Sequence, residues 1–261
     1  TTIASAPAPP PTWQALWQNS NNGQILRWEM GANGPFISGG PIGLGQAETT
    51  WQIKASADFN GDGQKDLLFQ HTQGHIAVWL LNGNSLIENR LISAVSDTNW
   101  QIVSAADFNN DGHADILFHH QRTGALSVWI MNRMSLVRGQ AVSPGSVSDT
   151  NWKVVGTGDF NGDNRPDLLW QHIRNGTIAV WLMNGTTMAG PWAFTLEAVD
   201  DPQWRLKGAA DVNEDGSLDL LWQHEGAGHL AVWYMNGRTF VRAALMNPAQ
   251  IPSGWFLRGA R

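Results

Sequence analysis

Short apolar runs separated by glycine, asparagine and aspartate recur along most of this chain. One repeat unit covers residues 100–151. It contains Trp100–Ala106, then Asp115–His120, then a turn at Gly124 and a third apolar run at 125–131. Runs of this length between turn-forming residues are typical of β-strands, whereas helical periodicity is scarce. The pattern predicts an all-β protein.

The same order of runs appears in each repeat. Runs equivalent to Trp100–Ala106 begin at Trp51, Trp152 and Trp204, and each ends in small residues, as expected where strands converge on an axis. The third run is apolar on both faces, as residues 178–183 illustrate, which predicts a strand buried between neighbouring sheets. Asn-Gly follows the third run in three repeats and predicts a hairpin to a fourth strand.

Four antiparallel strands in roughly 50 residues match one blade of a β-propeller. Residues 15–19 resemble the second strand of the repeat and residues 23–30 the turn and third strand, yet no first strand precedes them. Residues 255–260 resemble a first strand with no second strand after it. We therefore expect a five-bladed β-propeller of four-stranded antiparallel blades, in which the N- and C-terminal strands share one blade. The alternative is an open array that closes only by oligomerisation.

The repeat boundaries divide the chain into a leader and one domain. We expect a flexible Pro/Ala-rich leader over residues 1–11 and a single propeller domain over residues 12–261. The expected blades are approximately 12–50 plus 255–261, 51–99, 100–151, 152–203 and 204–254.

An acidic nonapeptide joins the first and second runs in four of the repeats. The copies start at Asp58, Asp107, Asp159 and Asp211, spaced by 49, 52 and 52 residues. Acidic or amide side chains stand at places one, three, five and nine, and the backbone carbonyl at place seven can add a further oxygen. Ca²⁺ takes six to eight hard oxygen ligands, and a tight loop can aim alternate side chains at one point. We therefore expect one Ca²⁺ in each loop, four per chain.

The expected calcium ligands follow from this spacing. They are Asp58, Asn60, Asp62, Gln64 and Asp66; Asp107, Asn109, Asp111, His113 and Asp115; Asp159, Asn161, Asp163, Arg165 and Asp167; and Asp211, Asn213, Asp215, Ser217 and Asp219. Place six needs a sharp turn with positive φ, which Gly63 permits and which Asn164 tolerates in the third loop. These loops are not EF-hands, because an aromatic residue stands where that motif needs a bidentate Glu. The alternative is a set of Asp/Asn/Gly turns that bind no metal.

Composition supports a metal-dependent exported protein. The formal charge is −6, and 12 of the 22 acidic residues occupy the ligand places of the four loops. Four Ca²⁺ would therefore bring the charge from −6 to roughly +2. There is no cysteine, no basic stripe for nucleic acid, and no apolar stretch long enough to span a membrane. Such sites suit calcium-rich extracellular fluid, so we expect a secreted or cell-surface protein.

The repeated sequence also resembles a known family. Asp-Phe-Asn-Gly-Asp-Gly-x-x-Asp-Leu-Leu, followed by Ile-Ala-Val-Trp-Leu-Met-Asn-Gly, is similar to the FG-GAP/VCBS repeats of bacterial secreted proteins, which are related to the calcium-bearing blades of integrin α chains. The resemblance covers residues 12–261. It implies a propeller with Ca²⁺ between the first and second strands of a blade, and the blade count resembles the tachylectin type.

Polar residues follow the second run of each repeat, beside an aromatic side chain. Amide or imidazole groups next to aromatic rings suit a sugar, whose C–H face stacks while its hydroxyls form hydrogen bonds. The candidate ligand-binding residues are Trp17, Gln18, Gln70, His71, His119, His120, Trp170, Gln171, His172, Trp222, Gln223 and His224. The alternative is that these polar groups satisfy neighbouring backbone groups. The repeated Trp residues of the first and third runs are expected to pack in the core.

These observations leave three hypotheses for function. The first is a secreted, calcium-stabilised, lectin-like binding module, because repeated carbohydrate sites multiply avidity. The second is an enzyme of lyase or biosynthetic type with one active site at the propeller mouth, and the third is a protein-adhesion platform. No nucleophile elbow, zinc-protease motif or phosphate-binding loop is present, so no catalytic residue is named. The expected partner is a glycan or another extracellular ligand.

Overall fold

The computed structural model describes residues 12–189, 195–196 and 199–260. The expected leader at residues 1–11 lies outside the described residues. Every regular element among those residues is a β-strand, and none is a helix that could cross a lipid bilayer.

The strands form five sheets, one per blade. Blade 1 contains β22 (Trp255–Ala260), β1 (Thr12–Asn19), β2 (Gln24–Gly31) and β3 (Phe36–Gln46). Blade 2 contains β4 (Trp51–Ala57), β5 (Asp66–His71), β6 (His75–Asn82) and β7 (Ser85–Ala94). Blade 3 contains β8 (Trp100–Ala106), β9 (Asp115–His120), β10 (Ala125–Asn132) and β11 (Ser135–Ser146). Blade 4 contains β12 (Trp152–Gly158), β13 (Asp167–His172), β14 (Ile178–Trp181) and β17 (Thr195–Leu196). Blade 5 contains β18 (Trp204–Ala210), β19 (Asp219–His224), β20 (His229–Asn236) and β21 (Thr239–Gln250).

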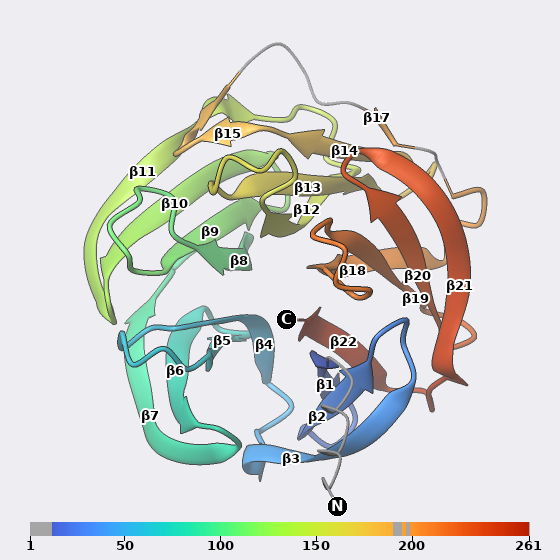
Figure 1. Cartoon of the computed structure of the whole chain (residues 1–261). Helices are drawn as coiled ribbons and strands as arrows, with labels where there is room; N and C mark the ends of the chain where they lie inside the picture. The colour runs from blue at the N-terminus through green and yellow to red at the C-terminus, as the bar shows by residue number, and fades with distance from the viewer. Residues whose placement is uncertain (1–11, 190–194, 197–198, 261) are drawn as a thin grey trace, which may run out of the picture.

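The five blades surround one axis, with the first strand of each repeat innermost (Figure 1). The innermost strands contact one another in a closed cycle, from β22 to β4, β8, β12, β18 and back to β22. The ring is completed by antiparallel pairing of β1 with β22, from Ala15 opposite Ala260 to Asn19 opposite Trp255. The prediction of a five-bladed propeller whose two ends share one blade is therefore confirmed.

Blade 4 departs from the repeat. The third strand expected over residues 178–183 stops at Trp181, and a short hairpin of β15 (Met183–Asn184) and β16 (Thr187–Met188) follows. This hairpin belongs to the sheet of blade 3, because β16 lies parallel to β11 at Ser143 and Thr187. The backbone N–H of Ser143 donates to the carbonyl of Thr186 at 2.8 Å. Blades 3 and 4 are therefore joined through their outer strands.

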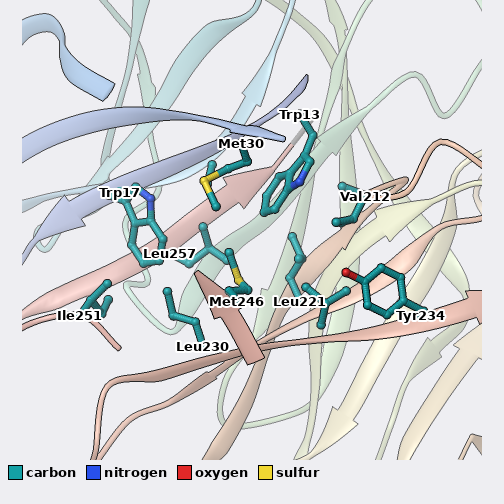
Figure 2. Close-up of a cluster of buried hydrophobic side chains, with 13 residues drawn as sticks. Trp13, Trp17, Met30, Val212, Leu221, Leu230, Tyr234, Met246, Ile251 and Leu257 are labelled. Atoms are coloured by element: carbon teal, nitrogen blue, oxygen red, sulfur yellow. The ribbon is translucent and has the colours of Figure 1, made fainter. Parts of the chain in front are cut away.

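The hydrophobic core is divided among the interfaces between blades. Five clusters of buried apolar side chains occur in the described chain, and each combines residues from two neighbouring blades. Figure 2 shows the cluster between blades 5 and 1, where Trp17 and Leu257 face Leu230 and Ile251. Because both faces of each sheet pack against another blade, removing one blade would expose two apolar surfaces.

Candidate functional site

The four acidic loops lie between the first and second strands of blades 2 to 5, as the sequence predicts. Places four and six of every loop have positive φ, which fits the Gly or Asn found at seven of these eight positions; the exception is Glu214 at place four of the fourth loop, with φ +60°. At place six, Gly63 has φ +82° and Asn164 has φ +62°, so the expected left-handed conformation of Asn164 is confirmed. The two left-handed residues fold each loop back toward its first residue.

Hydrogen bonds arrange the first, third and fifth side chains around the interior of the loop. In the first copy the Asp58 carboxylate accepts from the backbone N–H groups of Gly61 and Gly63, both at 2.7 Å. Asn60 Oδ1 accepts from the N–H of Asp62 at 2.9 Å, and its amide donates to Asp62 Oδ2 at 3.0 Å. The bonds from the place-six N–H to the first carboxylate and from the third amide to the fifth carboxylate recur in the other three loops.

The ninth residue of each loop is an aspartate with no exposed surface. Asp66 accepts with one oxygen from the N–H of Phe59 in the loop and with the other from the N–H of Leu81 on β6, both at 2.9 Å. Burial raises the pKa of this carboxyl, the two backbone N–H groups lower it, and the carboxylates of Asp58 and Asp62 raise it. The ninth carboxylate therefore fastens the loop to the third strand, and each oxygen keeps one lone pair for a cation.

The donor set of the loops fits a hard cation. Carboxylate, amide and carbonyl oxygens are the ligands of Ca²⁺, and no thiol or imidazole nitrogen is needed. Among the residues that the structure describes, no three acidic, imidazole or thiol side chains form a ready metal cluster. In the first loop the carboxylates of Asp58 and Asp62 accept hydrogen bonds from N–H groups of the loop itself, and the carboxylate at place nine is buried.

The side chain at place seven has a further contact. Gln64 Oε1 accepts from the N–H of Gly83 at 2.8 Å, and Ser217 Oγ accepts from the N–H of Gly237 at 3.1 Å. Both glycines stand in the Asn-Gly turns that follow the third strand. Each side chain therefore links its acidic loop to this hairpin.

Four glutamines that were candidates for ligand binding instead join neighbouring blades. Gln70 donates from Nε2 to the carbonyl of Trp100 at 2.8 Å and accepts at Oε1 from the N–H of Ile102 at 2.9 Å. We call this pair of bonds an amide bridge. The equivalent bridges are Gln18 to Trp51 and Ile53, Gln171 to Trp204 and Leu206, and Gln223 to Trp255 and Leu257.

The glutamines are no more than 2% exposed, and both polar atoms of each amide are occupied. The expectation that Gln18, Gln70, Gln171 and Gln223 contact a ligand is therefore wrong in this structure. The innermost strand of each blade has a free edge whose backbone groups need partners, and the preceding blade supplies them. Trp17, at 1% exposed, is likewise buried in the core between blades 5 and 1.

His119 takes the place of glutamine between blades 3 and 4. It is 1% exposed, and neither ring nitrogen has a hydrogen-bond partner. Its ring meets the edge of Trp170 at 5.5 Å between centroids. Burial, followed by the charges of Lys153 and His120, lowers the pKa of His119 to about 4. This interface therefore lacks the amide bridge, and His119 is not available to a ligand.

The remaining histidines of the candidate set form a second repeated contact. His120, His172 and His224 each place Nε2 at 3.0 Å from an aspartate carboxylate that precedes the first strand of the same blade. Each ring also meets the edge of the leading Trp, as in the pair of His120 and Trp100 at 4.9 Å. The pKa of the partner Asp97 is lowered to about 2, first by bonds from Asn99 and then by His120. His71 meets Trp51 in the same edge-on arrangement, at 4.9 Å between ring centroids.

Aromatic grooves occupy equivalent places on blades 3, 4 and 5. Each is lined by the leading Trp, an aromatic residue of the second strand, a small residue of the third strand and the Trp two places beyond it. The residues are Trp100, Phe118, Ser127 and Trp129; Trp152, Trp170, Ala179 and Trp181; and Trp204, Trp222, Ala231 and Trp233. The groove volumes are about 410, 580 and 350 Å³, within the range of small-molecule sites.

The repeated tryptophans pack on the core, as expected, and some of them also line grooves. Trp79 and Trp181 are buried, whereas Trp100, Trp129 and Trp233 pack against the core clusters with part of each ring exposed to a groove. Trp170 and Trp222, at 1% exposed, lie at the groove floor, and their indole N–H groups have no acceptor. In the three blades with grooves a small residue stands two places before the third-strand Trp and leaves space beside the ring. This residue alone does not predict a groove, because blade 2 also has Ala77 before Trp79 and there the ring is buried beside Gly43.

The fold and its repeated loops define a β-propeller with repeated surface features. A model of the FG-GAP-like repeat matches residues 58–118 and 159–222. The chain is thus a β-propeller protein of the FG-GAP type, and its fold is that of a binding or adhesion module. A search of the curated proteins finds no match to the chain.

Solved structures with a similar fold are distant in sequence. A protein of unknown function from Bacteroides caccae is 12% identical with a TM-score of 0.48, and the match covers 91% of this chain and 74% of that one. A chain of a nidogen/laminin complex is 11% identical with a TM-score of 0.48, and the match covers 93% of this chain and 97% of that one.

Proposed function

We propose that this propeller is a secreted, calcium-stabilised module that binds carbohydrate in the aromatic grooves of its blades. The observation that carries the proposal is the occurrence of the same groove on three consecutive blades. A structural packing defect would not be expected to repeat with the same residue types. Repetition suits a ligand that presents many copies of one group, as glycan-coated surfaces do.

The lining of the grooves supports a sugar as ligand. Within blade 3 the rings of Phe118 and Trp129 lie 4.7 Å apart, and Trp129 is half-buried, so part of its ring is available to stack on a sugar. Asp97, Ser96 and Ser127 supply acceptors and donors for hydroxyl groups at the same groove. The grooves of blades 4 and 5 have a predominantly apolar surface with a few polar groups, which is the usual composition of a small-ligand site.

The acidic loops support the calcium part of the proposal. Four copies of one oxygen-rich loop hold carboxylates that repel one another, and a bound Ca²⁺ would neutralise them. The first, third, fifth and ninth side chains and the place-seven carbonyl would hold the ion. Each loop also contacts the third strand, so ordering of the loop would stabilise the blade that carries the groove. Export follows from the need for abundant free Ca²⁺.

The proposal can be tested with variants in which a large side chain, placed at an exposed residue of the rim, blocks one groove at a time. Ser96, Ser148 and Ala243 each line one groove and are exposed, so a change to Arg fills the groove without disturbing the core. A glycan array on the calcium-loaded protein selects a sugar, and calorimetry then counts the sites. We expect about three sites, with one lost in each of Ser96→Arg, Ser148→Arg and Ala243→Arg.

The matched control is Ser85→Arg, an exposed position at the start of β7 that lines none of the three grooves. This variant should keep all sites and the same affinity. Failure of any glycan to bind, or unchanged stoichiometry in all three groove variants, would refute carbohydrate binding at these places.

A further inference from the structure

Positive charge gathers at the axis of this acidic protein. The adjacent innermost strands β18, β22 and β4 carry four cationic side chains: Arg205, Lys207, Arg258 and Lys54. At the place of Lys54, Arg258 and Lys207 in the repeat, β8 and β12 carry valine instead. β12 carries one further cation, Lys153, at the place of Arg205. Four of the five cations of the innermost strands therefore lie on three strands that follow one another around the ring (Figure 1).

The cations of this axial cluster have too few carboxylates to balance them. Glu225 is the one carboxylate in contact with it among the described residues, with Lys207 Nζ at 2.9 Å and Arg205 Nε at 3.7 Å. Lys54 Nζ donates to amide oxygens, those of Gln52 at 3.0 Å and Gln101 at 2.8 Å. Four cations against one carboxylate leave the cluster with a strong positive potential.

Two of the cations, Lys54 and Arg258, form no ion pair in the described part of the chain. Burial lowers the pKa of Arg258, and the charge of nearby Glu225 raises it without a direct contact. Arg258 Nε is buried and has no hydrogen-bond acceptor, and its guanidinium lies 5.3 Å from the centre of the Phe256 ring. Burial, and then the charge of Arg258, lowers the pKa of Lys54 to about 8. Burial lowers the pKa of Lys207, Glu225 raises it, and the charges of Arg258 and Arg205 lower it further. These groups are close enough to repel one another while partly removed from water.

We propose that the axial cluster binds a tetrahedral oxyanion, a sulfate or phosphate group, held by Arg258 and Lys54 with Lys207 beside them. Guanidinium and ammonium groups are the usual ligands of such anions, and a tetrahedral oxyanion has enough acceptor oxygens for donors from three strands. A bound anion would give the buried Nε–H of Arg258 the acceptor it lacks and would screen the repulsion across the cluster. This site is separate from the aromatic grooves and independent of their function.

The test is calorimetric titration of the full chain with sodium sulfate at constant ionic strength, and with sodium phosphate in calcium-free buffer. We expect saturable binding of one anion per chain. Arg258→Gln should weaken binding by about tenfold or more, because it removes a central cation. The matched control, Arg90→Gln, removes the same charge from an exposed site on β7 and should leave the affinity unchanged.

A second variant is expected to increase the anion affinity, so the proposal can still be tested if Arg258→Gln does not fold. Glu225→Gln removes the competing carboxylate, frees Lys207, and should tighten anion binding by about tenfold. A monosaccharide 6-sulfate titrated beside free sulfate identifies the source: equal or tighter binding of the ester supports a sulfated sugar, and binding of free sulfate alone supports an inorganic ion. Absence of saturable binding, or no gain in Glu225→Gln, would overturn the proposal.

Discussion

Replacing His119 by glutamine should stabilise the propeller, because it restores the missing amide bridge between blades 3 and 4. The other four interfaces have this bridge, and in each of them glutamine makes two hydrogen bonds to the innermost strand of the next blade. In His119→Gln, the new amide would meet the carbonyl of Trp152 and the N–H of Val154, the equivalent backbone groups. The side chain would leave no buried ring nitrogen without a partner.

The size of the gain follows from the two bonds. Each intramolecular hydrogen bond contributes about 1 kcal/mol net, so the bridge should add about 2 kcal/mol at neutral pH. In a domain of this size, a gain of this magnitude raises the melting temperature by about 4–8 °C. Differential scanning calorimetry and urea unfolding measure the two quantities directly.

The same substitution should also change the dependence of stability on pH. The pKa of His119 is lowered from 6.5 to about 4 in the folded protein, with burial as the largest cause. Between these values the unfolded chain binds a proton that the folded chain does not, so stability is complete above pH 6.5 and falls as the pH drops toward 4. The loss is on the order of 3 kcal/mol at the lower end. His119→Gln should lack this contribution.

Two control variants show whether a change in stability comes from the amide bridge. His75→Gln makes the same chemical change at an exposed position of β6 and should alter stability by less than about 0.5 kcal/mol. Gln70→His removes an existing bridge and should destabilise the interface of blades 2 and 3. If His119→Gln were no more stable than the parent while Gln70→His were clearly destabilised, the reasoning from hydrogen bonds would be refuted.

Three further predictions concern the loops and turns. Addition of EDTA should lower the melting temperature steeply, since each Ca²⁺ site contributes roughly 2.7 kcal/mol at a hundredfold excess of ion over Kd; an unchanged melt in chelator would contradict calcium stabilisation. Asp66→Ala should lower the free energy of unfolding, measured in urea, by about 2–4 kcal/mol, because it leaves the buried N–H groups of Phe59 and Leu81 without an acceptor. A decrease of less than about 0.5 kcal/mol would show that this carboxylate does not fasten the loop to the third strand. Gly124→Ala should destabilise strongly, since φ is +69° and a Cβ would lie 1.9 Å from the carbonyl oxygen of Val147; calorimetry showing a parental melting temperature would contradict the close approach.

Much of the fold is readable from the repeat. The first strands, such as Trp100–Ala106, and the second strands, such as Asp115–His120, have the bounds expected from the sequence. They are bounded by a Trp on one side and by the acidic loop on the other, so the signals are strong and repeated. The closure of the ring was also predictable, because each end of the chain lacks what the other supplies.

The sites were harder to predict, for a physical reason. Gln70 forms hydrogen bonds with Trp100 and Ile102, which belong to the next blade. The sequence of one repeat does not show which edge of the neighbouring blade lies beside this amide. The same limit applies to the half-buried Trp129, whose exposure depends on where the preceding blade ends. The broken strand of blade 4 depends on a contact with blade 3 that no local pattern contains.

The pairing of β1 with β22 has a mechanical consequence. Ala15 lies opposite Ala260, so the start of β1 and the end of β22 are at the same end of the pair. A pulling force applied to both termini would therefore separate these strands from that end, one hydrogen bond after another, instead of loading all the bonds at once. If the protein bears tension at a surface, the ring should open at this seam at low force, before any other blade is disturbed.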